Sequence, residues 1–333
     1  MTSALKTTAL LVLVAEICAS FANGRVLLQR LSKQTTAAAN TTVSDATSGN
    51  SVAPLGVYVL PPFSEVRSCV PFTVLIAAPT NASADGSGVL LVDADKDVSD
   101  NMDVTLFDGV LYLSISYGFA TNQKITVTVT PGTRSLSAVQ NSGTGNLIVD
   151  GDFKSTLFTV ASVGSGGTYV YGLAADKVRI FSDGSSTVLL MGDVSNGGSV
   201  KTGGMAKAYL TGRIGGNVTV ILGDFTNTYV HGLPGTAIRG SIDDQAQLRY
   251  TGGTCSLQST LGSPMSERCI QVQAKGAPSF NPSWSCGLQV QGVSQCTGVD
   301  ILTDGEFEPD THSPGMSVAR LPCLASGPLY VFR

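Results

Sequence analysis

Apolar residues recur with a fixed period across the middle of the chain, between residues 141 and 253. One glycine in each repeat marks the period. The residue two positions before this glycine is apolar in every copy, and the residue four positions before it is mostly apolar or small. Because side chains two residues apart lie on the same face of a strand, this spacing predicts β-strands. The marks are glycines, separated by one step of 21 residues and then by four of 20: Gly151, Gly172, Gly192, Gly212, Gly232 and Gly252.

Each repeat contains a second, weaker apolar pair six and eight residues after its glycine, for example Val178 and Ile180. Two short strands separated by glycine turns are therefore expected in every repeat. A helix is disfavoured because glycine costs about 1 kcal/mol per residue there. We predict an all-β fold: a single-stranded parallel β-helix, a solenoid with rungs of about 20 residues. The usual hand of parallel crossovers favours a right-handed helix.

The position three residues before each glycine faces away from the apolar columns. It reads Ile, Tyr, Leu, Tyr, Tyr and Arg, whereas a solvated face would carry serine, threonine and lysine. Stacked in register, these residues form a stripe, called here the tyrosine stripe. Three interpretations stay open: another part of the chain covers the stripe, the stripe binds the flat faces of sugar rings, or the register of the repeat is misassigned. Its candidate ligand-binding residues are Tyr169, Tyr209 and Tyr229.

The segments before the repeat divide into three. Lys6, an apolar run from Thr8 to Ile17 and small residues up to Ala22 predict a signal peptide over residues 1–22. The apolar run is too short to span a membrane. Residues 23–54 are mainly Ser, Thr, Ala, Asn and Gly, which predicts a disordered linker. Residues 55–131 have strand patterns without the glycine period, and we expect them to cap the solenoid of residues 132–254.

Cysteines favour a secreted protein. Six lie outside the signal peptide, and an even number in a secretory context predicts disulfides. Many pairings are possible, of which we favour Cys255–Cys269, Cys286–Cys296 and Cys69–Cys323. Residues 255–333 hold five of the six cysteines and form the predicted disulfide-rich, irregular C-terminal segment.

Trp284 in that segment is either part of a disulfide-held mini-core or a residue that stacks on a carbohydrate. Three sequons make the chain a candidate glycoprotein, at Asn40, Asn81 and Asn217.

Six short motifs follow one another along the chain: Phe63-Ser64-Glu65-Val66, Phe72-Thr73-Val74, Gly109-Val110-Leu111-Tyr112-Leu113, Ile125-Thr126-Val127-Thr128-Val129, Ser142-Gly143-Thr144-Gly145 and Val163-Gly164-Ser165-Gly166. This order of motifs resembles the putative auto-transporter adhesin, head GIN domain family. The resemblance spans roughly residues 60 to 254. It implies a secreted, mostly bacterial β-helical module with no established catalytic residues, so that no site transfers. Later repeats depart from the Gly-Ser-Gly pattern, as in Asp183-Gly184-Ser185-Ser186.

Charge argues against nucleic acid as a partner, because the net charge is −4 and only 13% of the residues are charged. No catalytic constellation is convincing. The nearest approach to a polysaccharide hydrolase or lyase is Asp243 and Asp244 with His231 and Arg239.

A run of three aspartates, Asp93, Asp95 and Asp97, begins like a calcium loop. It has Val98 where such a loop needs glycine and Val104 where it needs glutamate. We expect a solvated acidic turn there, and neither a metal site nor a cofactor.

These observations predict a secreted, non-catalytic surface or matrix protein that associates with glycan or cell wall. Its expected partner is a cell-wall or matrix polysaccharide or a surface protein, with no stable membrane span after signal cleavage. The alternatives are a polysaccharide-active β-helix enzyme and a purely structural spacer.

Overall fold

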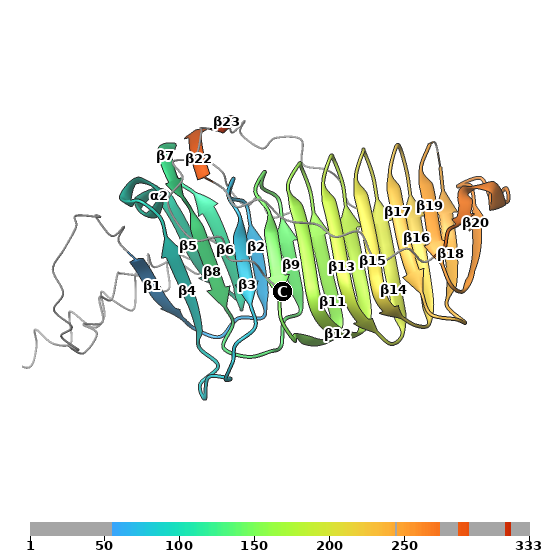
Figure 1. Cartoon of the computed structure of the whole chain (residues 1–333), viewed down its shortest axis with the longest axis horizontal. Coiled ribbons are helices and arrows are strands. Elements are labelled where there is room, and N and C mark those ends of the chain that lie inside the picture. Colours follow the sequence, from blue (N-terminus) through green and yellow to red (C-terminus); the bar gives the residue numbers. More distant parts are fainter. Residues whose placement is uncertain (1–54, 244, 274–285, 293–316, 321–333) are drawn as a thin grey trace, which may run out of the picture. The chain divides into compact units, whose positions relative to one another are not determined.

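The structure, a computed structural model, describes residues 55–243, 245–273, 286–292 and 317–320. The predicted signal peptide and linker, Asn40, Asp244 and Trp284 lie outside these residues. The regular secondary structure of the described part is almost entirely β-strand, and most of its strands stack in parallel into a solenoid (Figure 1). The predicted all-β solenoid is therefore confirmed. Within the described residues, no helix is both long and apolar enough to cross a membrane.

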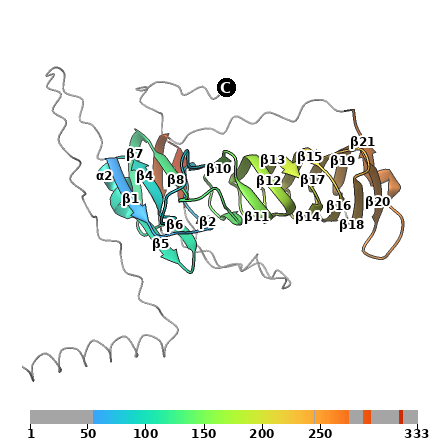
Figure 2. The ribbon, with the colours of Figure 1, turned by 90° about the horizontal axis from the view of Figure 1, so that it is seen from below.

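Two parallel ladders form the solenoid and lie on its two sides (Figure 2). Each rung contributes one strand to each ladder. In order of pairing, the first ladder consists of β8 (Thr126–Thr130), β3 (Val74–Ala77), β10 (Leu147–Asp150), the first half of β12 (Gly167–Ser182), β13 (Thr187–Val194), β15 (Lys207–Ile214), β17 (Asn227–Gly232), β19 (Gln247–Thr251) and β21 (Cys269–Gln271).

The second ladder follows the same stacking. It consists of β6 (Val110–Ile115), β2 (Glu65–Ser68), β9 (Ala138–Asn141), β11 (Lys154–Ser162), the second half of β12, β14 (Gly197–Thr202), β16 (Asn217–Leu222), β18 (Ala237–Ile242) and β20 (Thr254–Gln258).

Stacking order and chain order differ at the start of the solenoid. Val66 of β2 pairs with Leu111 of β6 on one side and with Val139 of β9 on the other. The rung made by β2 and β3 thus lies between two others. On one side is the rung of β6 and β8, which follows it in sequence, and on the other is the rung of β9 and β10, the first that a glycine marks. Nothing in the local sequence signals this insertion, because both pairings are long-range.

Antiparallel strands extend both ladders beyond the rung of β6 and β8. β4 (Gly88–Asp93) pairs with β8, β1 (Leu55–Leu60) pairs with β4, and β5 (Met102–Phe107) pairs with β6. The short helix α2 (Lys96–Asn101) is capped by Asp95, whose Oδ1 accepts a hydrogen bond from the Val98 amide at 3.2 Å. Asp95 therefore serves as a helix N-cap. A separate antiparallel sheet contains β7 (Phe119–Lys124), β22 (Cys286–Gln291) and β23 (Ser317–Arg320).

The core lies between the two ladders. Apolar side chains two residues before the first five glycines point inward and are almost completely buried, as in Val170, Leu190 and Leu210, whereas Tyr250 in the last repeat is partly buried. Their glycines form tight corners. Gly212 has φ of 109°, and a Cβ there would lie 2.1 Å from the Gly192 carbonyl oxygen, so that only glycine lets adjacent rungs approach this closely.

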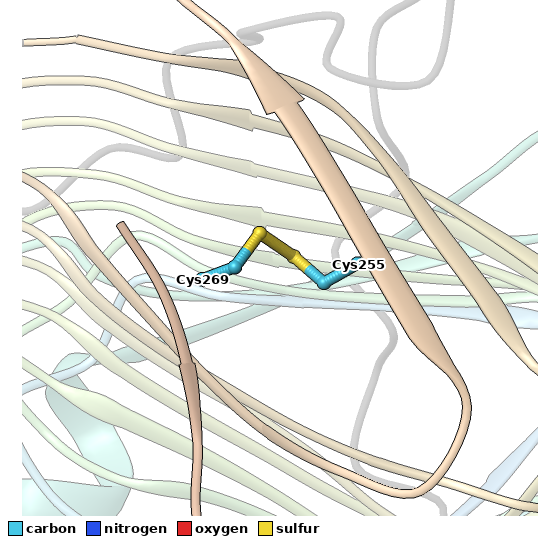
Figure 3. Close-up of a disulfide and its surroundings, with 2 residues drawn as sticks. All are labelled: Cys255 and Cys269. Carbon is cyan, nitrogen blue, oxygen red and sulfur yellow. A yellow bond between two sulfur atoms is a disulfide. The ribbon is translucent and has the colours of Figure 1, made fainter. Parts of the chain in front are cut away.

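A disulfide closes the last described rung. Cys255 of β20 is bonded to Cys269, at the start of β21, after a loop that contains the short 3-10 helix η1 (Ser266–Arg268) (Figure 3). The predicted Cys255–Cys269 pair is confirmed. Cys69 is also disulfide-bonded. The side chain of its partner is not among those that the structure describes, and the same holds for the predicted Cys286–Cys296 bond.

Candidate binding surfaces

The tyrosine stripe runs across the outer face of the first ladder. Tyr169 is the register partner of Leu189, and Leu189 is the partner of Tyr209. Tyr209 in turn lies beside Tyr229, and Tyr229 beside Arg249. Because neighbouring strands are about 4.8 Å apart, side chains in this column contact those of the next rung.

The two ends of the stripe differ in burial. Leu189 points outward but has 0% of its surface exposed, and Ile148 is only 6% exposed. All three tyrosines are partly buried, whereas Arg249 is exposed. The end around Leu189 is therefore packed, and solvent reaches the stripe mainly from Tyr209 to Arg249.

Burial also sets the ionisation of the phenols. It raises the pKa of Tyr169 above its ordinary value. It raises the pKa of Tyr209 as well, although the positive charge of Arg249 acts in the opposite direction. Both phenols therefore stay protonated at neutral pH and keep their O–H groups as hydrogen-bond donors.

Polar side chains flank the exposed end of the stripe. Lys207, Asn227 and Gln247 occupy one register column of the same face, two residues before Tyr209, Tyr229 and Arg249 along their strands. His231 of β17 lies on the other side of Tyr229 along its strand and is partly buried. This face thus combines adjacent aromatic rings with amide and cationic donors, which is a suitable set for sugar rings and their hydroxyl groups.

A groove lies along a third, much shorter side of the solenoid, where the two or three residues after each glycine corner pair in parallel with those of the next rung. Its central column passes from Lys154 to Ala174, Asp193 and Arg213 on successive rungs. Ser135 is bridged to Lys154 and extends the column by one more rung. The groove has a volume of about 790 Å³, within the range of small-molecule binding sites.

Hydroxyl groups and charges of both signs line this groove. Its cations are Lys154 and Arg213, and its anions are Asp176 and Asp193. The Ser195 hydroxyl donates to Asp176 Oδ1 at 3.2 Å. Although Asp193 and Arg213 are register partners, no ion pair within 4.0 Å joins them in the described part of the chain. The other hydroxyl-bearing residues of the lining are Ser135, Ser137, Ser155 and Thr156.

Sequence reasoning missed the groove because its column is not at a fixed distance from the glycines. Lys154 is three residues after Gly151, Ala174 two after Gly172, and Asp193 and Arg213 one after Gly192 and Gly212. A register shift in β12, between Tyr171 and Leu173, accounts for part of this drift. An alignment of repeats on their glycines therefore scatters the groove residues over three columns.

The three described residues of the enzyme alternative, Asp243, His231 and Arg239, are not brought together. His231 is the register partner of Thr251, the last residue of β19, whereas Asp243 precedes β19. The length of β19, about 17 Å at 3.3 Å per residue, separates these two positions. Asp243 Oδ1 accepts a hydrogen bond from the Thr260 amide at 2.9 Å, and Arg239 belongs to the other ladder.

Among the predicted glycosylation sites, Asn81 and Asn217 are both exposed. Asn217 is the first residue of β16, and Asn81 lies in the segment between β3 and β4. Both side chains are therefore accessible to a modifying enzyme, and their glycosylation stays a prediction.

Comparisons with known proteins agree with the fold. A putative adhesin from Bacteroides fragilis NCTC 9343 is 16% identical with a TM-score of 0.50, and the match covers 66% of this chain and 95% of that one. A putative adhesin from Parabacteroides distasonis ATCC 8503 is 14% identical with a TM-score of 0.41, over 66% and 95%. A putative lipid binding protein from the same organism is 12% identical with a TM-score of 0.40, over 66% and 97%. No curated protein matches the sequence.

At such low identity, the first of these structures supports the fold alone. The sequence comparison is more specific, because the model of one protein family matches a continuous segment inside the range where the resemblance was expected. The resemblance is thereby confirmed, and residues 81–220 of the chain are similar to the putative auto-transporter adhesin, head GIN domain family.

Proposed function

We propose that this protein is a secreted, non-catalytic surface protein that attaches to a polysaccharide of a cell wall or matrix. The observation that carries the proposal is the pair of partly exposed tyrosines, Tyr209 and Tyr229, in register on adjacent rungs of the first ladder. The similarity of residues 81–220 to an adhesin family supports a surface role.

The geometry of the solenoid suits a polymer. Successive rungs repeat the same face about every 4.8 Å, which is close to the length of one pyranose unit along a glycan chain. Tyr209 and Tyr229 are therefore spaced to stack on neighbouring sugar units. Lys207 and Arg249, both exposed on this face, provide donors for hydroxyl or carboxylate groups of the same chain.

The proposal is tested by retention of the purified mature chain, with its disulfides intact, on cell walls and a panel of insoluble polysaccharides. We expect saturable retention on at least one of them. The double variant Tyr209→Ser, Tyr229→Ser should lose at least 10-fold in affinity, since each stacked aromatic ring contributes about 1 kcal/mol.

Tyr117→Ser is the matched control, because Tyr117 is 67% exposed and lies outside both ladders. Its retention should equal that of the wild type. Equal retention of the double variant, with an unchanged melting temperature, would contradict the proposal. Loss of folding in the double variant would show that both tyrosines belong to the core.

A further inference from the structure

We infer that the groove on the short third side of the solenoid is a second carbohydrate site, and that its ligand is a neutral glycan chain. The inference does not rest on the tyrosine stripe binding anything. It rests on the volume of the groove, the exposure of its charged residues and the chemistry of its lining.

The groove is long and open enough for an oligomer. Its column from Ser135 to Arg213 crosses five rungs, a distance of about 19 Å at 4.8 Å per rung. The side chains of Lys154, Asp176, Asp193 and Arg213 are all exposed in it. An extended chain can therefore lie along the axis of the solenoid and meet an equivalent position on each rung.

The balance of charge selects a neutral ligand. Two cations and two anions line the groove, and Asp193 lies directly beside Arg213. A polyanion would bring its negative groups against Asp176 and Asp193, and a polycation would meet Lys154 and Arg213. Either ligand would place like charges together, which is unfavourable.

The hydrogen-bonding groups match the hydroxyl groups of a sugar. A carboxylate accepts two or more hydrogen bonds, so Asp176 and Asp193 are suited to vicinal diols. Arg213 and Lys154 donate to sugar oxygens, and the serine and threonine hydroxyls both donate and accept. Neither Asp193 nor Arg213 has an ion-pair partner within 4.0 Å in the described residues, so no such pair must break when a ligand binds.

The apolar part of the groove favours a glycan over a peptide. It consists of Leu157, Ala174, Ala175, Val194 and Leu233, with no aromatic ring. Ala175 and Val194 are buried and give this part of the floor small apolar side chains. A floor of small side chains fits the C–H faces of sugar rings, whereas specific peptide recognition uses pockets for alternate side chains.

The test is titration of the full mature chain with soluble hexamers of glucose, mannose and N-acetylglucosamine, with the dissociation constant measured by calorimetry. We expect one of these oligomers to bind. Asp176→Asn, Asp193→Asn and Arg213→Gln should each weaken that binding about 10-fold, because each change removes a charge-assisted hydrogen bond. Asp103→Asn, an exposed change on β5, is the matched control and should leave the constant unchanged.

The variant Tyr209→Ser, Tyr229→Ser should also leave this constant unchanged, which separates the groove from the proposed function. Failure of all three neutral oligomers to bind, or binding unaffected by the groove variants, would overturn the inference. Tighter binding of polygalacturonate, weakened by salt, would overturn it in favour of an acidic polymer. Binding of a peptide in the groove, lost in the same variants, would overturn it in favour of a protein partner.

Discussion

Tyr209 of β15 and Tyr229 of β17 are register partners on neighbouring rungs, and both point away from the buried columns formed by Leu210 and Val230. This relationship follows from a 20-residue repeat that keeps every side chain in its column. It also divides the roles of adjacent residues: Leu210 stabilises the solenoid, and Tyr209 is presented on its outer face.

The inward columns should determine stability, whereas outward apolar residues should not. Leu210→Ala removes a side chain that is only 1% exposed, and we expect it to lower the free energy of unfolding by about 2–5 kcal/mol. Ile221→Ala is the matched control because Ile221 is 49% exposed, and its effect should stay within about 0.5 kcal/mol. Chemical denaturation of both variants measures the difference. Equal effects would mean that the inward and outward faces are misassigned.

A methyl group added at a corner glycine should destabilise the protein in two ways. It strains the backbone at positive φ, and it collides with the neighbouring rung. Gly109→Ala introduces strain at φ of 74° but meets no atom within 4 Å, so we expect a loss of about 1–2 kcal/mol. Gly212→Ala combines positive φ with a contact 2.1 Å from the Gly192 carbonyl oxygen, and it should cost clearly more. Thermal unfolding of the two variants compares them directly. A smaller effect at Gly212 would argue against close stacking of the rungs.

Tyrosine ionisation should destabilise the protein at alkaline pH. The pKa of Tyr169 is raised above the ordinary tyrosine value of 10.0 because burial penalises the phenolate. In the folded state the phenol thus keeps its proton longer than in the unfolded state. Its contribution to stability is fully present below pH 10 and is lost as the pH rises through the raised pKa. Tyr169→Phe should flatten this part of the stability curve, measured by denaturation at several pH values, and an unchanged slope would contradict the burial of this ring.

Peptide mapping should recover the disulfide of Cys69 in a peptide that contains Cys323. Phe72, three residues after Cys69, contacts Phe119 of β7 with ring centroids 6.3 Å apart. β7 pairs with β22, and β22 pairs with β23, which ends at Arg320, three residues before Cys323. The chain therefore reaches the neighbourhood of Cys69 just before Cys323. Mass spectrometry after digestion without reduction tests this pairing, and a Cys69 peptide linked to any other cysteine would refute it.

The sequence predicted the repeating part of the fold well, because a strict period expresses the same physical requirement in each rung. The glycine columns, the inward apolar positions and the register of the tyrosine stripe all follow from it. The insertion of β2 and β3 could not be predicted in this way, since Val66 pairs with Leu111 and Val139 through contacts distant in sequence. Similarly, the complete burial of the outward Leu189 depends on tertiary packing, and the repeat pattern does not predict it.

The tyrosine stripe and the groove also differ in how far the sequence predicts them. Tyr209 and Tyr229 fall at one position of the repeat, so sequence alone placed them side by side. Asp193 and Arg213 are equally close in space, but the groove around them includes Lys154 and Ala174, whose distances from their glycines differ. Insertions and register shifts are accommodated in the short side of a rung. A column of residues on that side is therefore not visible when the repeats are aligned on their glycines.

The most direct test of the central claim is a titration of the mature protein with a soluble oligomer of the polysaccharide that retains it, followed through the ring signals of Tyr209 and Tyr229 by NMR. If the two rings stack on sugar, both signals should shift saturably and give one common dissociation constant, while the signal of Tyr117 stays constant. If the oligomer binds and neither signal moves, the ligand lies elsewhere on the protein and the tyrosine stripe is not its binding face.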